Sequence, residues 1–422
     1  MELRKFCVSD INWNNKRVVI RSDFDVPIEN GEVSCNDRIL AAFATIKYII
    51  RHNCHSMVIL SHLGSPDGRR DPEFSLRQVV DELDRLLSRE FAKKVLFVDD
   101  MYDAYMDGMA LNPPRGVVLL FENMQYYIEE IRMTNDRKRY ASRESIMRFH
   151  RHLKRYADVY VNDTFRYSHL PHASIAPYFI GPRVAGLAMS RELQYFHKIV
   201  GKPQRPIIAI LAGNRIVDKL RMMSYLLERI DELIIGGAVA YTFLKETAGM
   251  EIGDTLYVKN AGEIVNGILG KADDYAVKVH LPEDFIMGDI NDPESAETVT
   301  VEKGIPKGKM GLDIATLSTY LFADIIQRAK TILWNGTMGV IEAEEYCSGT
   351  MGIMYAVSYA SKHGATSIVV GEDTSMFCQR NKCLHNISHT SMGRAGEELL
   401  MGRMLPGVQA LRTKGRCKCR FK

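Results

Sequence analysis

Charged side chains follow a short apolar run near the start of the chain, in the stretch KRVVIRSDFDVP from Lys16 to Pro27. The apolar residues 18–20 suit a strand that is covered on both faces of a parallel sheet. Arg21, Asp23 and Asp25 follow at the point where such a strand ends. Because ligands bind at the carboxyl edge of open α/β sheets, the stretch predicts a ligand site.

Glycine-containing loops stand at the ends of other predicted strands: SHLGSPDG from Ser61, LAGNRIVDK from Leu211, IIGGAVAYTFLK from Ile234, WNGTMGV from Trp334 and VGEDTS from Val370. Glycine lets backbone N–H groups approach phosphates, and the N-termini of helices favour anions. The loops of the second half together predict a nucleotide site, with Lys219 on the phosphates and Asp373 on magnesium. No loop carries the G-x-x-x-x-G-K-S/T pattern, which argues against a P-loop enzyme.

Strands and helices must alternate to place such loops at one sheet edge. In the first half, apolar runs predict strands over residues 18–21, 57–60, 95–98, 117–121 and 159–161. Helical spacing of apolar residues predicts helices over residues 37–51 and 76–87, the second with Ser75 as its N-cap. This order is typical of a mostly parallel, doubly wound α/β sheet.

The alternation stops at Gly181 and Pro182 and resumes after GKPQRP at residues 201–206. A helix predicted over residues 184–200 lies between these interruptions and is interpreted as a connector of two domains. Strands are then predicted near residues 207–211, 232–235, 277–280, 331–334 and 367–370. We therefore expect a second parallel sheet.

Composition limits the class of protein. At 422 residues the chain exceeds the size of one hydrophobic core, so two domains are expected. The 46% hydrophobic and 25% charged residues are ordinary globular values, and a net charge of +3 gives no reason to expect nucleic acid. The sequence has neither the apolar core of a signal peptide nor a membrane-spanning run, which predicts a cytoplasmic protein with no membrane partner. Its eight cysteines, without C-x-x-C pairs, are expected to be reduced thiols.

Two basic segments allow two interpretations each. Residues 132–155 form either a solvated helical face or a binding surface, and we favour the solvated face. The tail from Lys414 to Lys422 is either a solvated end, which we favour, or a device that binds an acidic protein partner.

A series of motifs in order resembles the phosphoglycerate kinase family along nearly the whole chain. The motifs are RSDFDVP from Arg21, Arg38, SHLG from Ser61, FEN from Phe121, VNDTF from Val161, VDKL from Val217, EIGDTL from Glu251, MGLD from Met310, WNG from Trp334, GEDT from Gly371 and LPGV from Leu405. The resemblance implies a monomer with two Rossmann-like doubly wound parallel-sheet domains joined by a hinge helix. Its parts are residues 1–183, a helix over 184–200, a nucleotide-binding domain over 201–401, and a segment 402–422 that returns to the first domain and ends in the basic tail 414–422.

The resemblance also implies a reaction, the reversible transfer of a phosphoryl group between ATP and 3-phosphoglycerate after a hinge closure. Arg38 matches the arginine that stabilises the transferring phosphoryl group, for which a guanidinium is well suited. Asp23 and His62 match residues that contact 3-phosphoglycerate, and Asp25, also a candidate for this site, stands where the family usually has asparagine. Arg166, where the family has glycine, is a further candidate for binding this acidic substrate.

The implied site for ATP or ADP with Mg²⁺ lies in the second half. Lys219 matches a catalytic phosphate-binding lysine, Glu342 the ribose contact, and Asp373 with Thr374 the magnesium and phosphate contacts. The remaining candidates are Gly213, Arg215, Gly236, Gly237, Leu256, Gly311, Leu312, Asn335 and Gly371.

The sequence departs from the family pattern mainly at the substrate phosphate. Ser65, Gln125 and Leu170 stand where arginines are expected, and each lost charge-assisted hydrogen bond would remove about 1.5–3 kcal/mol of binding free energy. Near the nucleotide, Glu372 replaces a glycine and Arg394 adds a cation. Two functions therefore stay open: a phosphoglycerate kinase with weakened substrate binding, or an inactive paralogue that serves as a nucleotide-binding or structural protein.

Overall fold

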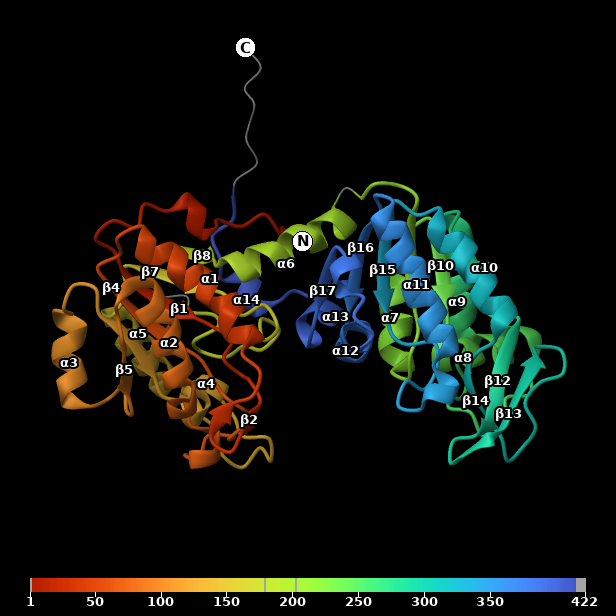
Figure 1. Cartoon of the computed structure of the whole chain (residues 1–422), viewed down its shortest axis with the longest axis horizontal. Coiled ribbons are helices and arrows are strands. Elements are labelled where there is room, and N and C mark those ends of the chain that lie inside the picture. The colour runs from red at the N-terminus through yellow and green to blue at the C-terminus, as the bar shows by residue number, and fades with distance from the viewer. Residues whose placement is uncertain (1, 178–179, 202, 415–422) are drawn as a thin grey trace, which may run out of the picture. The chain divides into compact units, whose positions relative to one another are not determined.

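The structure is a computed structural model that describes residues 2–177, 180–201 and 203–414. The chain divides into two compact units. Unit 1 comprises Met1–Gln194 and Met404–Lys422, and unit 2 comprises Tyr195–Arg403. Each unit is built on its own parallel sheet with helices on both faces (Figure 1). The predicted α/β fold with two parallel sheets is therefore confirmed.

The sheet of unit 1 has the strand order β5-β6-β4-β1-β7-β8, and all its pairs are parallel. Its strands are β1 (Arg17–Arg21), β4 (Ser56–Leu60), β5 (Val95–Val98), β6 (Val118–Phe121), β7 (Val159–Asn162) and β8 (Arg183–Ala185). Its helices are α1 (Asp37–Arg51), α2 (Val80–Phe91), α3 (Ala104–Leu111), α4 (Ile128–Ile131), α5 (Arg143–Arg155) and α14 (Pro406–Gln409). A small hairpin joins β2 (Ile28–Glu29) to β3 (Glu32–Val33).

Strand β1 shows why helices cover both faces of the sheet of unit 1. Val18 and Ile20 pack in a buried cluster with residues of α1 and α2 such as Ile46. Val19 points to the other face and packs in a second cluster with Phe149 of α5. A run that is apolar on both faces thus buries both, as expected for a parallel sheet.

The main sheet of unit 2 has the order β11-β10-β9-β15-β16-β17, again all parallel. Its strands are β9 (Ile207–Leu211), β10 (Glu232–Ile235), β11 (Lys278–His280), β15 (Thr331–Asn335), β16 (Thr366–Val370) and β17 (His389–Ser391). The helices are α7 (Ile216–Leu226), α8 (Gly237–Ala248), α9 (Gly262–Asp274), α10 (Thr316–Gln327), α11 (Ser348–Lys362), α12 (Glu372–Arg380) and α13 (Arg394–Leu400). Helix α6 (Leu187–Val200) begins in unit 1 and ends in unit 2.

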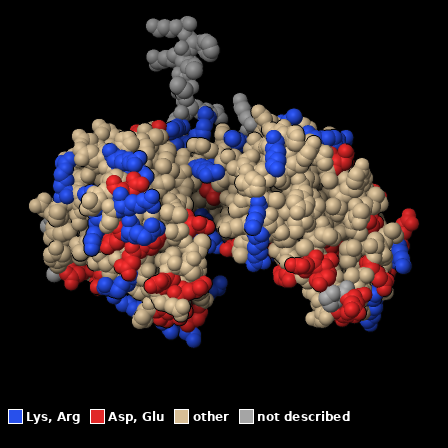
Figure 2. All heavy atoms as spheres, viewed as in Figure 1, with Lys and Arg blue, Asp and Glu red and all other residues tan. Residues whose placement is uncertain are grey.

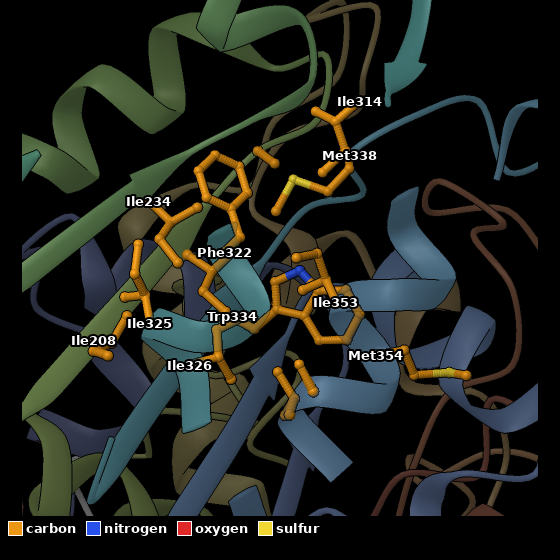
Figure 3. Close-up of a cluster of buried hydrophobic side chains, with 14 of the residues drawn as sticks. Ile208, Ile234, Ile314, Phe322, Ile325, Ile326, Trp334, Met338, Ile353 and Met354 are labelled. Carbon is orange, nitrogen blue, oxygen red and sulfur yellow. The ribbon is translucent and has the colours of Figure 1, made fainter. Parts of the chain in front are cut away.

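Trp334 lies in an apolar cluster of unit 2. Its side chain is fully buried, with Phe322 of α10 and Ile353 of α11 in the same cluster (Figure 3). The cluster fixes α10 and α11 against β15, and so fixes the loop that follows Trp334.

Two parts of this architecture differ from the prediction. The helix expected over residues 184–200 begins at Leu187, because Val184 and Ala185 extend the first sheet as β8, where Val184 pairs with Val161. An antiparallel sheet in unit 2, with the order β13-β12-β14, was not predicted. It consists of β12 (Asp284–Asp289), β13 (Asp292–Thr300) and β14 (Met310–Ile314).

The C-terminal segment is hydrogen-bonded within unit 1. Gly407 N donates to Ser168 O at 2.9 Å, and Phe6 N donates to Arg412 O at 2.9 Å. Of the predicted basic tail, residues 415–422 lie outside the described residues, so the acidic partner stays a prediction.

Among the described residues, no helix is long and apolar enough to cross a membrane. On the face that Figure 2 shows, acidic and basic side chains are interspersed.

Candidate functional site

A cavity of about 590 Å³ lies in unit 2 where the strands of the main sheet end. The loops after β9, β10, β15 and β16 line it with Gly213, Gly237, Gly336 and Gly371. These are the glycine loops from which the sequence predicted a nucleotide site. The parallel sheet brings them together because all four strands end at the same edge.

All but one of the residues predicted to bind nucleotide line this cavity. They are Gly213, Arg215, Lys219, Gly237, Leu256, Gly311, Leu312, Asn335, Glu342, Gly371, Asp373 and Thr374. The exception is Gly236, which is buried and does not line the cavity. A Cβ added to it would lie 2.1 Å from Met338 Sδ. Met338 itself lines the cavity, and Leu256 is 53% exposed at its wall.

Two glycines allow the loops to touch one another through their backbones. Gly336 has a φ of +102°, and a Cβ on it would lie 1.9 Å from Ala212 O. Gly237 has a φ of +57°, and its Cβ would lie 2.4 Å from Gly213 N. A side chain at either position would collide with the neighbouring loop and push the two loops apart. The positive φ also disfavours any residue with a Cβ, so both positions require glycine.

The side chain of Lys219 extends from α7 into the cavity and is almost completely buried. Its ammonium donates a hydrogen bond to Asn335 Oδ1. Burial lowers the pKa of Lys219 to about 8, while the negative charge of Glu397 is the strongest of the effects that raise it. A cation in this position is suited to bind phosphate oxygens.

Arg394 adds a second cation, held by three carboxylates. Its Nη1 lies 2.8 Å from Asp218 Oδ2 and 3.4 Å from Glu397 Oε2, and its Nε donates to Glu398 Oε1 at 2.9 Å. The hydrogen bond with Asp218 raises the pKa of Arg394 further. Glu397 lines the cavity and was missed in the sequence, where it stands among acidic and apolar residues of α13 with no motif to mark it.

Helix α12 begins at the cavity with two acidic residues, Glu372 and Asp373. Thr374 follows, and its Oγ1 accepts a hydrogen bond from Gly336 N at 2.9 Å. Among the described residues, no three His, Cys, Asp or Glu side chains are grouped so that they could hold a metal ion. If Mg²⁺ bound here, Asp373 would offer it one carboxylate, and its other ligands would come from phosphates and water.

In unit 1, the residues predicted around the acidic substrate form a second cluster. Arg38 on α1 donates to the backbone oxygen of Asp25 and lies 3.3 Å from its carboxylate. The same carboxylate accepts from Gly64 N at 2.8 Å and from the hydroxyl of Tyr167 at 2.5 Å. Asp23 Oδ1 accepts from Asp25 N at 3.2 Å. The structure thus brings Asp23, Asp25 and Arg38 together at the end of β1.

The carboxylates of this cluster differ in their environment. Burial raises the pKa of Asp23, against the positive charges of Arg38 and Arg166. Burial acts in the same direction on the pKa of Asp25, but the hydrogen bonds from Tyr167 and Gly64 and the positive charge of Arg38 favour the ionised carboxylate. Asp25 is therefore the ionised partner of Arg38.

His62 is a neutral ring in this cluster. Its Nδ1 lies 3.0 Å from Arg21 Nη2, and since arginine only donates, Nδ1 accepts and the proton is on Nε2. Burial and the charge of Arg21 hold the pKa of His62 well below its ordinary value. Nε2 is buried without a hydrogen-bond partner among the described residues, and the ring meets Tyr167 edge-on at 4.1 Å. His62 is thus a donor suited to a ligand oxygen.

A buried network behind the cluster was not predicted. Arg21 Nε donates to Ser174 Oγ at 2.9 Å, and this hydroxyl donates to Glu130 Oε1 at 2.6 Å. Burial raises the pKa of Glu130, and the charge of Arg21 opposes this shift. The network fixes Arg21 and through it the tautomer of His62. No spacing signal connects these residues, which lie far apart in the sequence.

Comparison with known proteins identifies the family. The family model described as phosphoglycerate kinase matches residues 8–403. The chain belongs to the phosphoglycerate kinase family. It is 40% identical to a probable phosphoglycerate kinase of Caenorhabditis elegans over 97% of this chain and 98% of that protein. It is also 40% identical to the phosphoglycerate kinase of Schistosoma mansoni over 97% of this chain and 99% of that protein. The solved structure of phosphoglycerate kinase from Coxiella burnetii matches with a TM-score of 0.83 and 28% identity, covering 96% of this chain and 98% of the other.

Within this member of the phosphoglycerate kinase family, the three positions expected to carry arginine add no charge to the cluster of unit 1. Ser65 is exposed, Leu170 is partly buried, and Gln125 is buried with its N–H on Asn123 Oδ1 at 3.0 Å. The positive charges of Arg38 and Arg166 act on Asp23.

Proposed function

We propose that the protein is a phosphotransferase that moves a phosphoryl group reversibly between ATP and 3-phosphoglycerate, with weak binding of the acid. The observation that carries the proposal is the cavity of unit 2, in which Lys219, Asp373 and Thr374 converge on glycine loops suited to phosphates. Membership of the phosphoglycerate kinase family supports it. On the same grounds we place the reaction in glycolysis or gluconeogenesis in the cytoplasm.

In this proposal the two units hold different reactants. Unit 2 binds ATP or ADP, with Mg²⁺ held by Asp373 and the phosphates. The cluster of unit 1 binds the acid, for which His62 offers its Nε2–H and Arg38 its guanidinium. Because the reactants are held by different units, transfer requires a closure such as the resemblance implies. The chain supplies position and positive charge, and the metal when bound neutralises phosphate charge.

The ion pair between Arg38 and Asp25 supports the proposal that the acidic substrate binds weakly. Arg38 is already paired with Asp25, so a substrate must compete for its guanidinium. The loss of the arginines at Ser65, Gln125 and Leu170 removes charge from the part that would hold the substrate phosphate. Each missing charge-assisted bond costs about 1.5–3 kcal/mol of binding free energy, so even one would raise the substrate KM by about ten-fold or more.

A coupled assay at high 3-phosphoglycerate concentration tests the activity. We expect a measurable rate in the parent and a loss of about 100-fold in Arg38→Ala, because the charge on the transferring phosphoryl group is no longer neutralised. Arg51→Ala is the matched control: Arg51 ends the same helix and pairs with Glu90 on the surface. Equal rates in the parent and in Arg38→Ala would refute the proposed reaction.

A second function is favoured by the same missing charges, namely a nucleotide-binding protein without catalysis. Calorimetry with ADP–Mg and with 3-phosphoglycerate, measured separately, distinguishes binding at the two units. The combined variant Ser65→Arg, Gln125→Arg and Leu170→Arg then decides between the functions. A rise in activity supports the weakened enzyme, whereas an inactive variant that binds both ligands supports the nucleotide-binding protein.

A further inference from the structure

The carboxylate of Glu397 lies inside the cavity of unit 2, among groups that favour an anion. Its Oε2 is 3.4 Å from Arg394 Nη1 and 3.7 Å from Arg215 Nη1. Its Oε1 is 3.4 Å from Asn335 Nδ2. The residue is only 9% exposed, so water contributes little to the solvation of its charge. Glu397 therefore depends on these cations and donors.

The same carboxylate is close to the beginning of α12. A Cβ built on Gly371, the N-cap of this helix, would lie 3.2 Å from Glu397 Oε1. The N-terminus of a helix carries a partial positive charge and binds phosphates. Of all the charges that raise the pKa of Lys219, that of Glu397 has the largest effect. The lysine, two arginines and the helix end thus share one carboxylate.

We propose that Glu397 is a specificity-determining residue, an internal counter-anion that occupies the phosphate-binding part of the cavity and that a nucleotide phosphate must displace. The inference rests on the proposed function, because it takes the cavity as the site of a nucleoside diphosphate or triphosphate. It predicts that Glu397 weakens the binding of polyphosphate anions. The carboxylate is then a competitor of the ligand and not a group that assists it.

A simple anchoring role for Glu397 would predict the opposite effect. Arg394 is already held by Asp218 at 2.8 Å and by Glu398 at 2.9 Å, and its contact with Glu397 is the longest of the three. Arg394 therefore keeps two carboxylate partners when Glu397 loses its charge. If Glu397 were needed to position Arg394 for phosphates, its removal would weaken binding.

The test is Glu397→Gln, which keeps the shape of the side chain and removes its charge. Calorimetry measures two probes separately, ADP and inorganic pyrophosphate, at low ionic strength. We expect both to bind about ten-fold more tightly, or more, because a close like charge is lost in a poorly solvated site. Glu232→Gln is the matched control: Glu232 is 7% exposed in the same unit, pairs with His280 at 2.7 Å, and starts β10 outside the cavity lining. It should leave both affinities unchanged.

The outcomes separate this inference from the proposed function. Tighter pyrophosphate binding without any ADP binding supports the role of Glu397 and refutes the nucleotide site. Unchanged or weaker binding of both probes in Glu397→Gln overturns the inference, whether or not the parent binds ADP. If Glu397→Gln does not fold, Glu397→Ser is measured in the same way. Failure of both to fold also overturns the inference, because the carboxylate would then be a structural anchor.

Discussion

The affinity for ADP is expected to fall as pH rises above about 8, because Lys219 loses its charge. Burial lowers the pKa of Lys219 to about 8 in the free protein, and a bound phosphate would raise it again. Each pH unit above the pKa of the free protein then lowers the affinity about ten-fold. Between about pH 7 and about pH 9.5 the fall is about thirty-fold, or about 2 kcal/mol. This lies within the range of about 1.5–3 kcal/mol for a hydrogen bond to a charged group.

Calorimetric titration with ADP over this pH range measures the effect. The second phosphate pKa, about 6, lies below the range and contributes little. Tyr241, which also lines the cavity, does not titrate in this range, because burial raises its pKa well above the ordinary value. Lys219→Met is the control without a cation. It should bind ADP with the low affinity that the parent reaches at high pH, and with no dependence on pH.

Two results would refute this reasoning. A flat profile in the parent would mean that Lys219 keeps its charge or does not contact the phosphates. An equal slope in Lys219→Met would assign the pH dependence to another group. An opposite slope has no source in the ionisation of this lysine, since the charged form is the one that binds an anion.

Three further predictions concern stability and the glycine loops. Burial raises the pKa of Asp163 from 3.8 to about 7, so the folded state binds its proton more tightly. Its contribution to stability is complete below about pH 4 and is lost as pH rises to about 7, by roughly 4 kcal/mol; urea unfolding of Asp163→Asn should lack this dependence. Trp334→Ala should lower the free energy of unfolding by about 3–5 kcal/mol, measured by circular dichroism, because Trp334 is fully buried. Gly237→Ala should weaken ADP binding, since its Cβ would lie 2.4 Å from Gly213 N. Gly249→Ala, also at positive φ but with no atom within 4 Å, should cost stability and leave ADP affinity unchanged.

Much of the fold could be predicted because buried parallel strands are short apolar runs. Ile207–Leu211 is such a run, and the structure buries every residue of it. The glycine loops come after these runs, so the position of the cavity followed from the sheet. The antiparallel strand Asp292–Thr300 could not be predicted in this way. Its residues are mostly polar and exposed, and its pairing depends on its neighbour β12 rather than on its own pattern.

The charged and polar side chains that complete the two candidate sites were harder to predict than the backbone loops that form them. Motif positions located Lys219 and Asp373 because a local stretch of sequence marks each of them. Glu397 has no such signal, because it meets Asn335 only through the packing of α13 against the sheet, across 62 positions of sequence. Tyr167 is similar, since its hydroxyl reaches Asp25 across 142 positions. Contacts of this kind are set by tertiary packing and need a structure.

The two units share one electrostatic feature that bears on affinity. In unit 1 the cation proposed for the phosphoryl group, Arg38, is paired with Asp25. In unit 2 Arg394 and Arg215 both lie within ion-pair distance of Glu397. A ligand phosphate gains Arg38, Arg215 or Arg394 only as that arginine leaves a carboxylate, so the net gain is smaller than the strength of the new bond. In each unit by itself, therefore, the number of arginines overstates the binding of anions, and the carboxylates that already pair with them lower the affinity.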